Sequence, residues 1–211
     1  MSQSRLWSLL DTEREKLAHE LSHLTQEQWL APSLCESWNV RDVVAHLAAA
    51  GSTGTVAWLG NMVTSRFDTD RHNARLAARY LGANYRETMQ NFERTLANRI
   101  APLGAAAGLL SEVIVHGQDI AQPLGIDLEP SRSAVLEVAS FMASKDFAVK
   151  SKTLVKDLKL VASDYPFSVG DGPVVHGKLL DLVMVIAGRQ SYLERVSGEG
   201  VLEVRERLLT D

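Results

Sequence analysis

Apolar positions recur at helical spacing through the first part of the chain. From residue 5 to residue 24 a leucine stripe runs between polar residues, at Leu6, Leu9, Leu10, Leu17, Leu21 and Leu24. A second stripe follows the i, i+3, i+4, i+7 spacing of one helix face, at Val40, Val43, Val44 and Leu47. Asn39 can cap this second helix, with Asp42 as its acidic third residue. The pattern therefore predicts one helix over residues 5–23 and another that begins after Asn39.

Roughly four long helices are expected by residue 125, which is enough for an up-and-down or crossover bundle. Beyond the two above, helical stretches are predicted over 55–65, over 73–100 as one or two helices, and over 105–122. Pro123 and Gly125 end the last stretch. Two polar stretches, 32–37 and 67–72, are predicted to be loops.

The pattern changes after residue 127, near Pro130. Helices are predicted over 133–147 and 177–188, and strands over 158–162 and 165–169, with a turn at Gly170, Gly172 and Pro173. Residues 201–207 could form a strand or a helix, and the pattern favours a strand. The predicted fold is mostly α: residues 1–127 form a helical bundle, and residues 128–211 form a small α+β domain.

Composition excludes several classes of partner. The net charge of −4 comes from interspersed residues, without the basic stripe that nucleic acids or membrane surfaces require. The longest apolar run near the end, 182–187, is too short to span a bilayer. Cys35 is the only cysteine, which excludes an internal disulfide and fits a reducing cytoplasm. The composition thus predicts a cytoplasmic protein that binds neither nucleic acid nor membranes.

The stretch 109–120 holds the residues most suited to chemistry. On a helix, Glu112 and His116 lie one turn apart on the face that Leu109, Val113 and Ile120 turn toward the core. Burying a carboxylate without a partner is costly, so a cation or an ion pair is expected there. A Glu and a His at this spacing can each place a ligand atom about 2.0–2.2 Å from one ion.

His46 is the candidate third ligand, because it lies at the edge of the apolar face of the helix after Asn39. Two histidines and one carboxylate leave positions on the ion open, as in catalytic sites. Carboxylates can fix ring orientation, and Asp119 and Asp42 each lie one turn from a candidate histidine. Zinc suits this ligand set best, and nickel, iron and manganese also accept it.

The same three residues also have a purely structural interpretation. Glu112 and His116 could form an ion pair within one helix. His46 could be a core histidine bonded to a backbone carbonyl, and Asp42 could serve only as a helix cap.

Other candidates carry weaker signals. Three histidines in polar surroundings are expected to be solvated: His19, His23 and His72. His176 falls in a glycine-rich turn. Cys35 has no histidine near it in sequence, so a buried or bystander thiol is expected rather than a nucleophile. The tryptophans are expected to be core anchors: Trp7, Trp29, Trp38 and Trp58.

Two motifs resemble a known family. The first motif covers residues 38–47 (Trp-Asn-Val-Arg-Asp-Val-Val-Ala-His-Leu). The second covers residues 112–120 and is followed by Pro-Leu-Gly at 123–125. Together they resemble the two signatures of the mycothiol-dependent maleylpyruvate isomerase family. This family is an actinobacterial branch of the DinB-like metal-binding bundles. Shorter motifs in the C-terminal half follow that family's order, at 162–164, 170–173, 187–189 and 197–201.

The resemblance implies a DinB-like four-helix bundle that binds zinc or a similar ion, with ligands at His46, Glu112 and His116. It also implies a low-molecular-weight thiol, mycothiol, as cosubstrate. Arg189 in the C-terminal domain is the residue expected to help bind that thiol.

The leading hypothesis is a metal- and thiol-dependent transferase or thiol-assisted isomerase acting on a small electrophilic substrate. Coordination to the ion would convert the thiol to a thiolate at neutral pH. Two alternatives stay open: a hydrolase that uses metal-bound water, and a non-catalytic protein that binds or sequesters a ligand. A homodimer is also open, because no exposed apolar stripe decides the oligomeric state.

Overall fold

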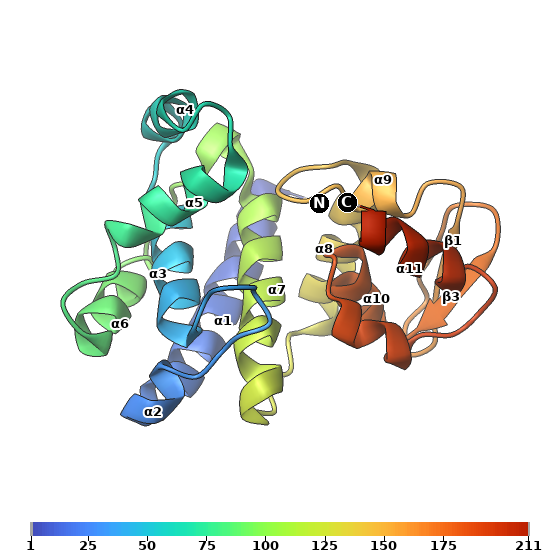
Figure 1. Cartoon of the computed structure of the whole chain (residues 1–211), viewed down its shortest axis with the longest axis horizontal. Helices are drawn as coiled ribbons and strands as arrows, with labels where there is room; N and C mark the ends of the chain where they lie inside the picture. Colours follow the sequence, from blue (N-terminus) through green and yellow to red (C-terminus); the bar gives the residue numbers. More distant parts are fainter. Residues whose placement is uncertain (1, 211) are drawn as a thin grey trace. The chain divides into compact units, whose positions relative to one another are not determined.

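The chain folds into two compact units in the computed structural model, which describes residues 2–210 (Figure 1). The first unit ends at Glu129 and the second begins at Pro130. This division lies close to the boundary predicted after residue 127. Whether each unit is a domain in its own right remains a prediction.

The regular structure of the first unit is helical. Its helices are α1 (Gln3–Ser22), α2 (Gln26–Trp29), α3 (Val40–Ala50), α4 (Thr55–Thr64), α5 (Thr69–Ala78), α6 (Tyr85–Glu93), η1 (Pro102–Gly104) and α7 (Ala106–Leu124). Helix α1 packs on α7, α7 on α3, α3 on α6, and α6 back on α1 (Figure 1). The contacts thus close a ring of four helices. No helix of residues 2–210 is long and apolar enough to cross a membrane.

Local sequence signals fix the two helices that matter most below. The Asn39 side chain accepts a hydrogen bond from the Asp42 backbone N–H at 3.0 Å, and the Asp42 carboxylate accepts one from the Asn39 N–H at 3.1 Å. This reciprocal cap confirms the predicted start of α3. The helix predicted over 105–122 continues through Pro123 to Leu124, and Gly125 then ends it with a left-handed φ of 66°.

The prediction of a loop over 67–72 is wrong from Thr69 onward. The Asp68 carboxylate accepts a hydrogen bond from the Arg71 N–H at 2.9 Å and starts α5 there. His72 therefore lies within a helix and is 2% exposed, which overturns its predicted solvation. The side-chain amide of Asn61 donates to the His72 carbonyl at 3.0 Å.

The second unit combines helices with a small sheet, and this confirms the predicted α+β class. Its elements are α8 (Arg132–Ser144), α9 (Ser151–Leu154), β1 (Lys159–Ala162), β2 (Ser168–Val169), β3 (Val174–Gly177), α10 (Leu179–Ile186), η2 (Gln190–Arg195) and α11 (Val201–Thr210). The strand order is β2-β1-β3, with β2 antiparallel and β3 parallel to β1. Helix α10 packs against α8 and against the sheet.

Two predictions for the second unit need correction. His176 lies in strand β3 and not in a turn. Residues 201–207, for which the sequence favours a strand over a helix, lie in helix α11, in which Glu203 and Arg207 form an i,i+4 ion pair. The turn prediction does hold: a Cβ added to Gly170 would lie 2.2 Å from the Leu158 carbonyl oxygen.

Candidate metal centre

Three side chains predicted as ligands converge where α3 and α7 pack together. His46 comes from α3, and Glu112 and His116 lie one turn apart on α7. Nε2 of His46 lies 3.0 Å from Oε2 of Glu112, and Nε2 of His116 lies 3.1 Å from the same oxygen. One ligand atom from each residue lies within 4.8 Å of the others. The structure thus brings together the three residues that helical spacing selected.

These distances fit a shared divalent ion. Ligand atoms about 2.1 Å from an ion lie about 3.0 Å apart at a right angle and about 3.4 Å apart at the tetrahedral angle. The separations of 3.0 and 3.1 Å therefore require little movement of the side chains. The side chains of His46, Glu112 and His116 keep 10%, 16% and 13% of their surface exposed, so the group is shielded but not sealed.

Hydrogen bonding sets the charges in this group. Burial alone would raise the pKa of Glu112, but hydrogen bonds from His116 and His46 outweigh it and hold that pKa far below 4.5. Burial likewise opposes the charged form of His116, but hydrogen bonds with Asp119, Cys35 and Glu112 raise its pKa well above 6.5. Without a metal, Glu112 and His116 thus form the ion pair that the sequence left open. A bound cation would take the place of the His116 proton.

Asp119 lies against the other nitrogen of His116. Its Oδ2 is 2.9 Å from Nδ1 of the ring, and its side chain is fully buried. A carboxylate at this position favours a proton on Nδ1, which leaves the lone pair of Nε2 directed at the place where an ion would bind. The contact is the one that the predicted orienting role of Asp119 requires, and that role remains a prediction.

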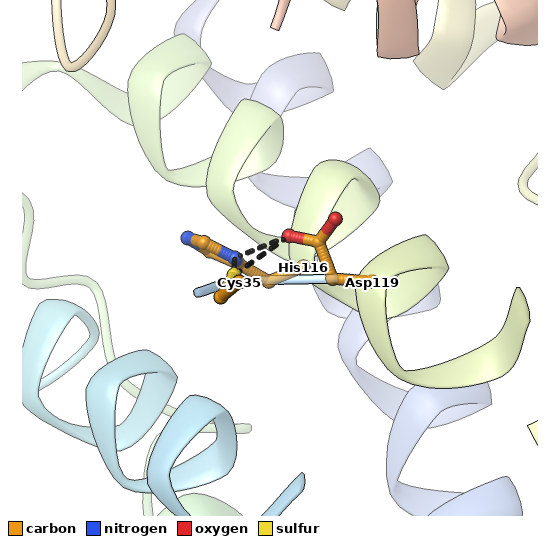
Figure 2. Close-up of side chains that lie close together, drawn as sticks. All are labelled: Cys35, His116 and Asp119. Atoms are coloured by element: carbon orange, nitrogen blue, oxygen red, sulfur yellow. Dashed lines mark hydrogen bonds and ion pairs between the residues drawn. The ribbon is translucent and has the colours of Figure 1, made fainter. Parts of the chain in front are cut away.

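Cys35 also lies beside His116, although no histidine is near it in the sequence. Its Sγ lies 3.4 Å from Nδ1 of His116 and donates to Oδ2 of Asp119 at 3.1 Å (Figure 2). The loop between α2 and α3 carries Cys35 to α7. Cys35 and His116 are 81 positions apart, so no local sequence signal could have shown the contact.

The remaining predicted site residues lie elsewhere. The Asp42 carboxylate serves the cap of α3, so it supports His46 only through the helix. The ring of Trp38 packs 5.2 Å from that of His46. Arg189 belongs to the second unit, where its guanidinium donates to the Ala187 carbonyl at 2.7 Å. Its role in thiol binding remains a prediction.

The chain is similar to one protein family and to two solved structures. Residues 10–70 match the family model described as the mycothiol maleylpyruvate isomerase N-terminal domain. No curated protein matches the chain. A crystal structure of the mycothiol-dependent maleylpyruvate isomerase superposes with a TM-score of 0.67 at 15% identity, covering 94% of this chain and 93% of that one. A histidine-to-alanine mutant of the isomerase gives 0.65 at 15% identity, with the same coverage. The predicted resemblance is confirmed, and the fold is shared over nearly the whole chain.

Proposed function

We propose that this chain, which resembles the mycothiol-dependent maleylpyruvate isomerases in motif and fold, is a metal- and thiol-dependent enzyme. It would transfer a low-molecular-weight thiol to a small electrophilic substrate, or use the thiol to isomerise that substrate. The observation that carries the proposal is the convergence of His46, Glu112 and His116 on one point between α3 and α7. Mycothiol is the proposed thiol because both the matching family model and the similar crystal structures are named for it.

The protein's own residues would hold and orient the ion. His46 and His116 would bind it through Nε2, and Glu112 would contribute one oxygen and a negative charge. Asp119 would keep the proton on Nδ1 of His116 and so fix the direction of the ring. A divalent ion in this place, which we propose to be zinc, would supply Lewis acidity and lower the pKa of a bound thiol. Three protein ligands leave room for that thiol.

Arg189 is the proposed binding residue for the thiol cosubstrate. A guanidinium presents several fixed donors, which suits carboxylate and carbonyl groups on a polar cosubstrate. Arg189 is half-buried just after α10, where its bond to the Ala187 carbonyl restrains it. An Arg189→Lys variant would keep the charge and lose the fork, so it should raise KM for the thiol more than it lowers kcat.

Elemental analysis of the purified, untagged protein tests the metal centre. We expect about one equivalent of a transition metal, absent from the His116→Ala variant and retained in His176→Ala, which changes a histidine of the second unit.

Turnover of electrophiles with and without mycothiol then tests the reaction. Turnover that needs no thiol would favour hydrolysis by metal-bound water, and binding without turnover would favour a sequestering protein. A protein that stays metal-free after incubation with zinc or nickel would overturn the proposal.

A further inference from the structure

The imidazole of His116 faces a different set of ligand atoms on each edge. Nε2 faces Glu112 and, beyond it, His46. Nδ1 faces Oδ2 of Asp119 at 2.9 Å and Sγ of Cys35 at 3.4 Å, and those two atoms lie 3.1 Å apart (Figure 2). A thiol, an imidazole and a carboxylate therefore converge on a point outside the metal centre proposed above.

The backbone holds Cys35 in this position. The N–H of Leu34 donates to the backbone carbonyl of Asp119 at 3.0 Å, which fixes the loop on α7. The hydroxyl of Ser33 accepts a hydrogen bond from the Cys35 N–H at 3.1 Å and donates to the Trp38 carbonyl at 2.8 Å. The loop thus presents Sγ to α7 through contacts that do not involve the thiol, so the group is assembled before any ligand arrives.

We propose that Cys35, Asp119 and Nδ1 of His116 form a second cation site, selective for thiophilic divalent ions such as Cd²⁺. Ligand atoms about 2.0–2.3 Å from a tetrahedral ion lie about 3.3–3.8 Å apart. The present separations of 2.9–3.4 Å reach this with outward shifts of a few tenths of an ångström. A thiolate ligand selects soft ions against Mg²⁺ and Ca²⁺.

The second site competes with the first for His116. An ion on Nδ1 replaces the proton that His116 shares with Asp119, and the thiol proton of Cys35 leaves to the buffer. Occupying both edges would require an imidazole with neither proton and would place two divalent cations across one ring. A soft ion at the Cys35 site therefore weakens metal binding at the His46–Glu112–His116 site, and the reverse also holds.

Cd²⁺ titration of the metal-free protein tests this site, with the ultraviolet cadmium–thiolate absorption as readout. Because Cys35 is the only cysteine, any such band reports on it alone. We expect the band in the wild type, its loss in Cys35→Ser, and at least tenfold weaker Cd²⁺ binding in Asp119→Asn. Glu112→Gln, which disables the first site, should keep the band. Circular dichroism of each variant checks that it folds.

Zinc-loaded protein tests the competition. We expect at least tenfold more Cd²⁺ to be needed for the thiolate band in zinc-loaded wild type than in Glu112→Gln treated in the same way. A missing band in the wild type, or unchanged affinity in Asp119→Asn, would overturn the second site. Equal Cd²⁺ requirements in the two zinc-treated proteins would overturn the competition. These results are independent of the proposed reaction, because they need neither thiol cosubstrate nor turnover.

Discussion

The interiors of the two units differ in kind. In the part of the chain that the structure describes, the first unit holds all but one of the buried polar and charged side chains: Glu13, Arg14, His46, Thr53, Asn61, Ser65, His72, Thr88, Thr95, Ser111, Gln118 and Asp119. The second unit contributes only Ser151. Its core is built from residues such as Val138, Val175, Leu182, Val183 and Val185. Polar groups are costly to bury unless they are hydrogen-bonded, so the fold of the first unit depends on internal hydrogen bonds more than that of the second does.

Buried charge alone does not mark a functional site, as Arg14 shows. It is 1% exposed, and its guanidinium donates to the carbonyls of Thr95 at 2.9 Å and Asn98 at 3.4 Å. These bonds satisfy the backbone beyond the end of α6, and the absence of a side chain on Gly51 leaves room for the guanidinium. Arg14 thus has a structural role, because it joins α1 to the backbone that follows α6. The group around His116 differs because its titratable side chains bond chiefly to one another.

The largest expected effect is a loss of stability from a substitution in the core of the second unit. Leu182 is 1% exposed in α10, and Leu182→Ala should lower the free energy of unfolding by about 2–5 kcal/mol through lost burial and a cavity. Denaturant unfolding measures this, with Leu202→Ala as control because Leu202 is 65% exposed. Metal content should not change. Loss of metal in Leu182→Ala would show that metal binding in the first unit depends on the core of the second.

A smaller effect is expected from Asp119 in the first unit. Asp119→Asn keeps the size of the side chain but weakens its hold on Nδ1 of His116, so metal affinity should fall by about 10–100-fold. Competition with a chelator of known affinity measures the change. Asp127→Asn, at an exposed carboxylate beyond the end of α7, is the matched control. If the two variants bind metal equally well, Asp119 does not orient the ring.

Local sequence predicted those parts of the site that depend on one helix at a time. The spacing of Glu112 and His116 on α7, and the cap formed by Asn39 and Asp42, are set within a few residues. Helical periodicity then gave the faces that turn inward. His46 could be selected because it lies on the inward face of a helix with a firmly marked start.

The errors arose where contacts between distant segments decide the outcome. Cys35 joins the site through a loop that docks on α7, and no periodicity describes a loop. His72 was assigned to solvent because its neighbours in sequence are polar, yet packing against Trp58 and Asn61 buries it. The segment 201–207 contains too few apolar residues to show a clear period, and as a helix it buries only Val204 and leaves Leu202 exposed.

The smallest effect, pH dependence, distinguishes the metal-free protein from the metal-bound one. The raised pKa of His116 stabilises the metal-free fold fully below about pH 6.5, and this contribution is lost as pH rises through the raised value. Metal affinity should change in the opposite direction, because an ion needs the ring without that proton. It should rise by at most about tenfold per pH unit for one displaced proton and level off above the raised pKa. Unfolding of the metal-free protein and chelator competition, each measured across this interval, give the two slopes.

Asp119→Asn removes one of the bonds that raise the pKa of His116, so both slopes should move to lower pH. Slopes of equal sign would show that His116 is not the group that exchanges its proton for the metal.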